Sequence, residues 1–181
     1  MNTTPAAGVP QPEGTGHQQE NPEKVVHPIP TFLKLTKILV PIDFSPTSQK
    51  ALQYAVPFAR QFGAKITLLY AIEPLPETEE RIYELVDIEQ VMRPVRKQLQ
   101  TLASSAVESD LLDATLVRSG VPFVVITDIA RDLEVDLIVI TTHGYTGLKH
   151  VFLGSTAERV VRHAPCPVLV VREREHEFIQ V

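Results

Sequence analysis

The chain has 181 residues and 44% hydrophobic side chains, which suits one domain of ordinary size with a sizeable core. Its 17 basic and 22 acidic side chains give a formal net charge of −5, so neither a nucleic-acid surface nor a polybasic membrane anchor is expected. No apolar run approaches the roughly 20 residues that a membrane span requires, and the N-terminus lacks the profile of a signal peptide. We therefore expect a cytoplasmic protein.

Both ends of the chain have the composition of tails. Residues 1–34 hold six of the 15 prolines and few large apolar side chains, so this segment cannot bury enough surface to offset its ordering entropy. Residues 174–181 are charged, and we expect them to fray. The sequence thus predicts a proline-rich disordered tail over residues 1–34, one folded domain over residues 35–173 and a charged tail over residues 174–181.

Between the tails, five apolar runs alternate with stretches of helical periodicity. Ser45 suits a helix cap, Pro46 the first helical position and Gly63 the helix end, whereas Pro57 and Pro94 are expected to bend the helices that contain them. The predicted strands are Lys37–Ile42, Ala64–Ala71, Ala114–Arg118, Asp136–Thr141 and Val168–Val171. The predicted helices run from Pro46 to Gly63, from Glu79 to Ser109, from Phe123 to Leu133 and from Ser155 to His163.

Strands that alternate with helices at this spacing predict an α/β fold, a parallel sheet covered by helices on both faces. In such sheets, ligands bind outside the carboxyl ends of the strands, where the winding direction reverses. Spacing alone does not order the strands.

The segment from Thr141 to Arg159 is predicted as the end of a strand, a glycine-punctuated loop and the start of a helix. Glycines let backbone N–H groups approach a ligand, and a helix N-terminus adds unpaired donors and partial positive charge. The segment therefore suits an anion such as phosphate. Its spacing matches neither the Walker A loop nor the G-x-G-x-x-G fingerprint.

This loop resembles that of the universal stress protein family, which follows the pattern G-x2-G-x9-G-[ST]. Gly144, the nine residues from Tyr145 to Leu153, and then Gly154-Ser155 match its last two glycines and the hydroxyl, whereas Thr141 stands at the first glycine. The resemblance covers about residues 36–172. It implies a Rossmann-like fold of the adenine nucleotide alpha hydrolase type, a five-stranded parallel sheet in the order 3-2-1-4-5. It also implies a homodimer that pairs the last strand, Val168 to Arg172.

The resemblance further implies an adenine nucleotide, ATP or AMP, with any Mg²⁺ arriving on its phosphates. Asp43 would contact the base, and Ser155 and Thr156 the phosphate oxygens. Two of these residues also have simpler interpretations, Asp43 as a turn or capping residue and Ser155 as half of a capping box with Glu158. The candidate nucleotide-binding residues are Pro41, Ile42, Asp43, Ala71, Thr141, His143, Gly144, Gly154, Ser155 and Thr156.

The number and spacing of the histidines and of the single cysteine indicate neither a metal centre nor a catalytic group. His143, His150 and His163 lie seven and thirteen residues apart, which fits no metal signature, and His143 alone is near the suggested ligand. The single cysteine, Cys166, is expected to be a small core residue, and a chain without a possible internal disulfide agrees with a reducing compartment. No Ser/His/Asp arrangement or nucleophile elbow is recognisable.

Three hypotheses follow for the function. The first is a nucleotide-binding regulator in stress adaptation that holds ATP or AMP without splitting it, because the loop lacks a Walker lysine and an acid that positions water. The second is a nucleotide-free dimeric interaction module of the same fold, in which Thr141 disables the crevice. The third is an enzyme of weak ATPase or phosphotransfer activity, with at most slow hydrolysis or self-phosphorylation.

Overall fold

The computed structural model describes residue 1 and residues 33–73, 88–142 and 154–172, and all structural statements concern these residues. The predicted N-terminal tail up to residue 32, residues 74–87, the loop residues 143–153 and the charged tail from residue 173 lie outside them. His143, Gly144 and His150 therefore have no described position. Among the described residues, no helix is long and apolar enough to cross a membrane.

Five parallel strands form one sheet in the order β3-β2-β1-β4-β5, as the family resemblance implies. The strands are β1 (Lys37–Pro41), β2 (Lys65–Ile72), β3 (Leu112–Ser119), β4 (Leu137–Thr141) and β5 (Val168–Val171). β3 is longer than predicted, because as an edge strand it is mostly half-exposed and its polar residues break the apolar run from which strands are recognised. The chain reverses its winding direction between β1 and β4.

Helix α1 (Pro46–Phe62) begins and ends where its capping residues predict. The Ser45 hydroxyl accepts the N–H of Ser48 at 3.0 Å, and Gly63 ends the helix in the left-handed conformation, at φ 69°. The helix runs through Pro57 to Phe62. Helix α3 (Ile88–Ala106) likewise contains Pro94, and it ends three residues before the predicted Ser109.

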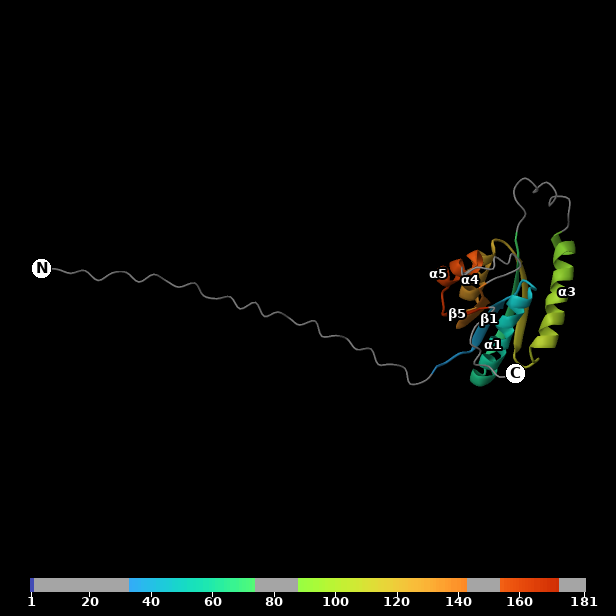
Figure 1. Ribbon diagram of the computed structural model, residues 1–181, viewed down its shortest axis with the longest axis horizontal. Helices are drawn as coiled ribbons and strands as arrows, with labels where there is room; N and C mark the ends of the chain where they lie inside the picture. Colours follow the sequence, from blue (N-terminus) through green and yellow to red (C-terminus); the bar gives the residue numbers. More distant parts are fainter. Residues whose placement is uncertain (2–32, 74–87, 143–153, 173–181) are drawn as a thin grey trace, which may run out of the picture. The chain divides into compact units, whose positions relative to one another are not determined.

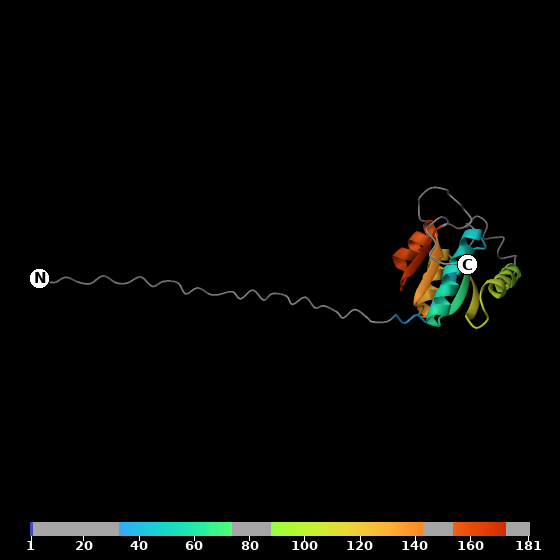
Figure 2. The ribbon, with the colours of Figure 1, turned by 60° about the horizontal axis from the view of Figure 1, so that its bottom comes forward.

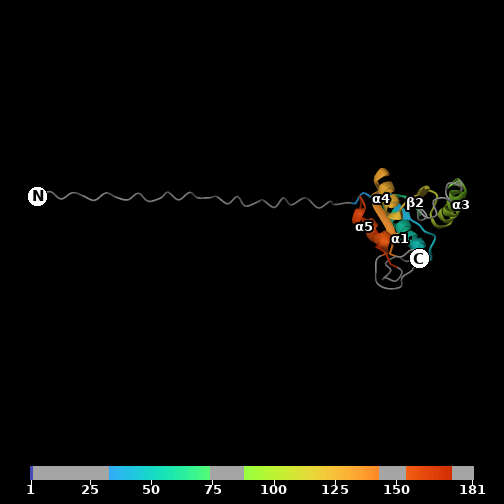
Figure 3. The same ribbon diagram turned by 90° about the horizontal axis from the view of Figure 1, so that it is seen from above.

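The helices cover the sheet in two layers (Figures 1 and 2). α1 and α3 bury one face, where Ala51, Ala55 and Leu99 meet Ile38 and Val40 of β1. α4 (Pro122–Asp132) and α5 (Ser155–His163) bury the other face around Leu39, Ile138 and Ile140. Seen from above, α3 and α5 lie at opposite ends of the sheet (Figure 3). Successive side chains of β1 point alternately into the two helical layers, which explains the near-continuous apolar sequence of this strand.

A carboxylate ties the first strand to the fourth at the amino end of the sheet. Asp136 Oδ2 accepts the Thr36 hydroxyl at 2.6 Å, the Thr36 N–H at 2.8 Å and the Lys37 N–H at 3.0 Å. The hydrogen bond from the Thr36 hydroxyl, together with these backbone N–H groups, holds the pKa of Asp136 below its usual value. Lys37 Nζ also donates to Leu133 O at 2.7 Å. These bonds align β1 with β4, the two strands whose opposite ends border the cavity described next.

Candidate functional site at the carboxyl ends of the strands

A cavity of about 320 Å³ lies at the carboxyl ends of β1, β2 and β4, where the strand order reverses. The first turns of α4 and α5 close it from the side. Eight of the ten candidate residues border it: Pro41, Ile42, Asp43, Ala71, Thr141, Gly154, Ser155 and Thr156. His143 and Gly144 lie outside the described residues. The structure therefore brings together segments that are more than 100 residues apart in the sequence.

Asp43 sits on a short turn between β1 and α1. Its carboxylate oxygen Oδ1 accepts the Ser45 hydroxyl at 2.6 Å and the Ser45 N–H at 3.0 Å. The N–H of Asp43 donates to Ser48 Oγ at 3.3 Å. Asp43 therefore has the turn role that its sequence position allows, and it borders the cavity as well.

The residue after Asp43 has an unusual backbone conformation. Phe44 adopts a φ of 63°, in the left-handed region that bulky side chains rarely occupy. Its ring stacks on Tyr70 of β2, with 4.8 Å between ring centroids. Burial, and secondarily the charge of Asp43, raise the pKa of the Tyr70 phenol, so the hydroxyl stays a donor at neutral pH.

The α5 side of the cavity is held by backbone hydrogen bonds of Thr142. Its carbonyl accepts the Gly154 N–H at 2.6 Å, and its N–H donates to Val171 O at 3.0 Å. These two bonds join the end of β4 both to the start of α5 and to β5. The first turn of α5 is thereby placed against the cavity by backbone atoms, independently of the side chains around it.

The predicted capping box at the start of α5 is wrong. Gly154 is the N-cap, it makes no side-chain cap hydrogen bond, and Ser155 is the first helical residue with an exposed side chain. Glu158 pairs with Arg162 at 2.8 Å instead of reaching back. The Gly154 carbonyl accepts the Glu158 N–H at 2.9 Å, so the helix starts one residue earlier than a serine cap would place it. The first-turn N–H groups of α5 thus have no side-chain cap.

The described lining has a polarised charge distribution. It includes the carboxylates of Asp43 and Glu73 at the ends of β1 and β2, and no lysine, arginine or histidine among the residues that the structure places there. The first turn of α5 supplies the partial positive charge of a helix N-terminus on the other side. Such a site can accept hydrogen bonds at one end and bind anionic oxygens at the other.

Thr141 borders the cavity in place of the first glycine of the loop pattern. Its side chain is nearly buried, at 7% exposure. The residue therefore occupies volume at the end of β4 that a glycine would leave open. The structure does not place it across the sheet from Asp43, since β1 and β4 are neighbours.

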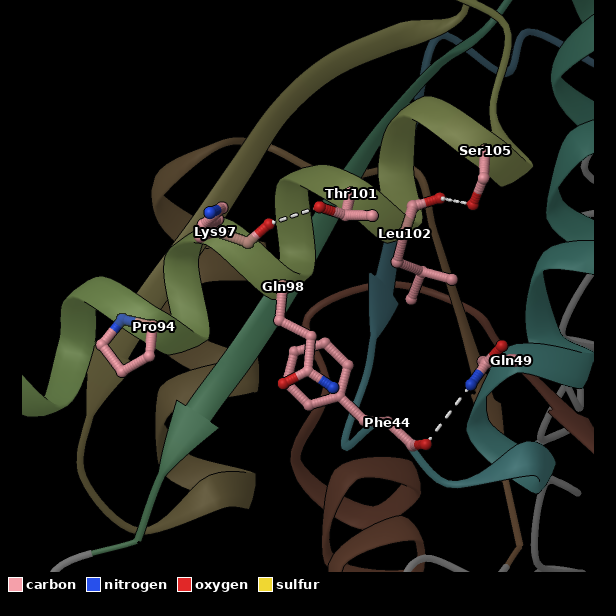
Figure 4. A pocket seen from close by; sticks show the side chains of 8 residues that line it. All are labelled: Phe44, Gln49, Pro94, Lys97, Gln98, Thr101, Leu102 and Ser105. Atoms are coloured by element: carbon pink, nitrogen blue, oxygen red, sulfur yellow. Dashed lines mark hydrogen bonds between the residues drawn. The ribbon is translucent and has the colours of Figure 1, made fainter.

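A larger hollow of about 490 Å³ lies elsewhere, between α3 and the turn that leads from β1 into α1. Phe44 and Gln49 face Pro94, Lys97 and Leu102 across it (Figure 4). It touches no strand end and is bordered mainly by the flexible polar side chains of one helix. We therefore place the candidate site in the smaller cavity, where polar groups from several elements converge.

The other chemically notable side chains lie away from the cavity. His163 is exposed at the end of α5, and its Nδ1 lies 2.8 Å from Arg159 O. Cys166 is half-buried and packs against the α4–α5 side of the core, as expected of a small apolar residue. Burial raises the pKa of its thiol, which disfavours the reactive thiolate.

Sequence reasoning missed about half of the cavity wall. The missed residues are Ser48, Leu69, Tyr70, Glu73, Pro122, Ile126, Ile140, Thr142 and Ala157. Some had a usable signal, because Tyr70, Glu73, Ile140 and Thr142 adjoin the predicted strand ends. Pro122 and Ile126 had none, since only the packing of α4 against the sheet brings them to the cavity.

A parallel sheet with helices on both faces and a cavity at its strand reversal defines a Rossmann-like α/β protein. The chain belongs to the universal stress protein family, whose sequence model matches residues 34–172. Universal stress protein MJ0531 of Methanocaldococcus jannaschii is 35% identical over 144 residues, 78% of this chain and 84% of that protein.

Solved structures share the fold. Protein MJ0577 of the same archaeon superimposes with a TM-score of 0.68 at 29% identity, over 79% of this chain and 99% of its own. A universal stress protein solved in complex with cAMP superimposes with a TM-score of 0.55 at 22% identity, over 77% of this chain and 98% of its own.

Proposed function

We propose that this universal stress protein binds an adenine nucleotide, ATP or AMP, in the cavity and acts as a nucleotide-responsive regulator in stress adaptation. One observation carries the proposal: Asp43 and the uncapped first turn of α5 border the same cavity at the strand reversal. A carboxylate suits the amino group of adenine, and the helix N-terminus suits phosphate. A universal stress protein of this fold was solved in complex with the nucleotide cAMP.

The residues that line the site support a nucleotide with its base toward β1 and β2. Pro41, Ile42 and Ala71 offer apolar walls to a flat base, and Ser155 and Thr156 bring the helix N–H groups to the phosphates. His143 and Gly144, from the adjoining loop, would complete the phosphate end. Among the described residues, no group of three His, Cys, Asp or Glu side chains could hold a metal ion, so Mg²⁺ would arrive on the phosphates.

Binding is proposed rather than rapid turnover. The described lining places no lysine or arginine where a transferred phosphoryl group would need one, and its two carboxylates sit at the base end. Slow hydrolysis or self-phosphorylation is kept as a third proposal for the site. Turnover above background that Ser155→Ala abolishes would be needed to assign an enzyme.

We further propose a homodimer that pairs the segment from Val168 to Arg172, which contains β5, in antiparallel fashion. β5 is the edge of the sheet, and its residues Val168, Leu169 and Val170 are half-exposed although apolar. Proteins usually cover such an edge, and a second copy of the strand would do so. A strictly monomeric mass by light scattering at micromolar concentration would refute this.

The second candidate is a dimeric interaction module that holds no nucleotide. One observation favours it, the nearly buried Thr141 at the cavity wall. The two candidates are separated by heat-denaturing freshly purified protein, analysing the supernatant for adenine nucleotide, and titrating the protein with Mg-ATP. Released nucleotide or saturable binding supports the first candidate. If neither is found and Thr141→Gly creates saturable binding, the threonine is the cause and the module is the better description.

A further inference from the structure

The turn that carries Asp43 is held by two buried serines, and the hydroxyl group of each donates one hydrogen bond and accepts another. Ser45 Oγ donates to Asp43 Oδ1 at 2.6 Å and accepts the Ser48 N–H at 3.0 Å. Ser48 Oγ donates to Ser45 O at 3.0 Å and accepts the Asp43 N–H at 3.3 Å. Both serines are only 4% exposed. The three residues therefore form a closed ring of hydrogen bonds.

This ring does more than cap α1. An N-cap needs one serine and one bond, and Ser45 already provides both through the Ser48 N–H. The additional bonds fix the carboxylate through Ser45 and the backbone amide of Asp43 through Ser48. A carboxylate held at both its side chain and its own amide has lost much of its rotational freedom before any ligand arrives.

Two further contacts fix the position of Phe44, which lies between Asp43 and Ser45. The Phe44 carbonyl accepts a hydrogen bond from Gln49 Nε2 at 3.3 Å (Figure 4), and the Phe44 ring stacks on Tyr70. A left-handed φ of 63° at a phenylalanine persists only where its surroundings enforce it. The whole turn is thus a rigid holder for Asp43, and Ser48 borders the cavity together with it.

We propose that Ser48 is a positioning residue that, with Ser45 and through Asp43, sets the base selectivity of the site. The inference rests on the proposed nucleotide binding. A carboxylate fixed at the base end accepts the 6-amino group of adenine, and it opposes the 6-carbonyl of hypoxanthine, which is itself an acceptor. Without the Ser48 hydroxyl, the Asp43 N–H and the Ser45 carbonyl lose their partner, while the two bonds from Ser45 to the carboxylate remain. The backbone that carries the carboxylate can then shift, so that the adenine contact weakens and the repulsion of a carbonyl is relieved.

The test compares the affinities of Mg-ATP and Mg-ITP by titration calorimetry. Their bases differ at position 6, an amino group in ATP and a carbonyl in ITP, and at N1, which carries a hydrogen only in ITP. The unchanged protein is expected to prefer ATP by about tenfold or more. Ser48→Ala should reduce this preference to about twofold, mainly by weakening ATP binding, while ITP binding changes little. Thr47→Ala is the matched control, since Thr47 lies in the same turn of α1 and takes no part in the ring. Its preference should equal that of the unchanged protein.

Ser48→Cys provides a second variant of nearly the same size, because a thiol is a weak donor and acceptor, and it should give an intermediate preference. Three outcomes overturn the inference: an unchanged preference in both Ser48 variants, a parallel loss of ATP and ITP binding in both, or the same loss of preference in Thr47→Ala. If the unchanged protein binds neither nucleotide, the proposed function itself fails. If it binds them and the Ser48 variants keep the preference, only the positioning role fails.

Discussion

Replacing Ser155 by glutamate should move stability and ligand affinity in opposite directions. Ser155 is exposed, is the first residue of α5 and borders the cavity, and the helix has no side-chain cap. A carboxylate in the first turn of a helix stabilises it by about 0.3–1 kcal/mol. For a domain of this size, about 0.5 kcal/mol raises the Tm by roughly 1–3 °C. The same carboxylate would lie beside the proposed phosphates.

The expected cost to binding follows from Coulomb's law. Two unit charges about 4 Å apart repel by about 4 kcal/mol at an effective dielectric constant near 20, and a flexible, exposed glutamate retains about half of that repulsion. Mg-ATP binding to Ser155→Glu should therefore weaken by about tenfold to a hundredfold, and less at high salt, where the repulsion is screened. Calorimetry and thermal unfolding measure the two effects separately.

Ser155→Gln is the matched control, because it has the same length without the charge. It should leave both the Tm and the affinity close to those of the unchanged protein. If Ser155→Glu bound Mg-ATP as tightly as Ser155→Gln at low salt, the phosphates would not lie at the start of α5. A fall in the Tm of the glutamate variant would contradict the uncapped helix start.

Three further changes test other parts of the structure. Asp136→Asn should lower the free energy of unfolding by about 1–2 kcal/mol at pH 7, because three bonds to a charged acceptor become bonds to a neutral one. Since the folded pKa is lowered, this deficit should be complete above about pH 5 and should shrink as the pH falls through the folded value, which lies below the unfolded value near 3.9. Urea titrations at several pH values measure it, and a deficit that grows as the pH is lowered would refute it. Gly120→Ala should lower the free energy of unfolding by about 1–3 kcal/mol in the same assay, because the φ of Gly120 is 145° and the new Cβ would lie 2.8 Å from Val125 Cγ2. An unchanged free energy of unfolding would show that the turn before α4 is readily rearranged. Val170→Pro should convert the proposed dimer to a monomer, as measured by light scattering. The N–H groups of Ile138 and Thr142 donate to the carbonyls of Pro167 and Val171, so the N–H of Val170 points away from β4 toward the open edge, and proline removes it. A variant that stays dimeric would exclude pairing through β5.

The fold was predictable from sequence up to the order of its strands. Each central strand is apolar on both faces, which is what a parallel sheet between two helical layers requires. The order of the strands depends on long-range pairing, such as Ile38 beside Leu137, that no local pattern encodes. Only the resemblance to a family supplied it.

The site was predictable where it adjoins strand ends and helix starts. Asp43 and Ser155 follow from that rule, but the cap of α5 does not. Ser155 and Glu158 have the spacing of a capping box, but the N-cap is Gly154, whose N–H bonds to the Thr142 carbonyl, a tertiary contact. The double role of Ser48 is likewise a matter of geometry. A serine three residues after a helix cap is common in sequences, and nothing in the sequence indicates that its hydroxyl accepts the Asp43 N–H.

A crystal structure of the protein with Mg-ATP would test the central claim most directly. The predicted result is a base within hydrogen-bonding distance of the Asp43 carboxylate, with phosphate oxygens against the N–H groups of Ser155 and Thr156. A nucleotide bound in the hollow along α3, or one whose phosphates point away from α5, would contradict it.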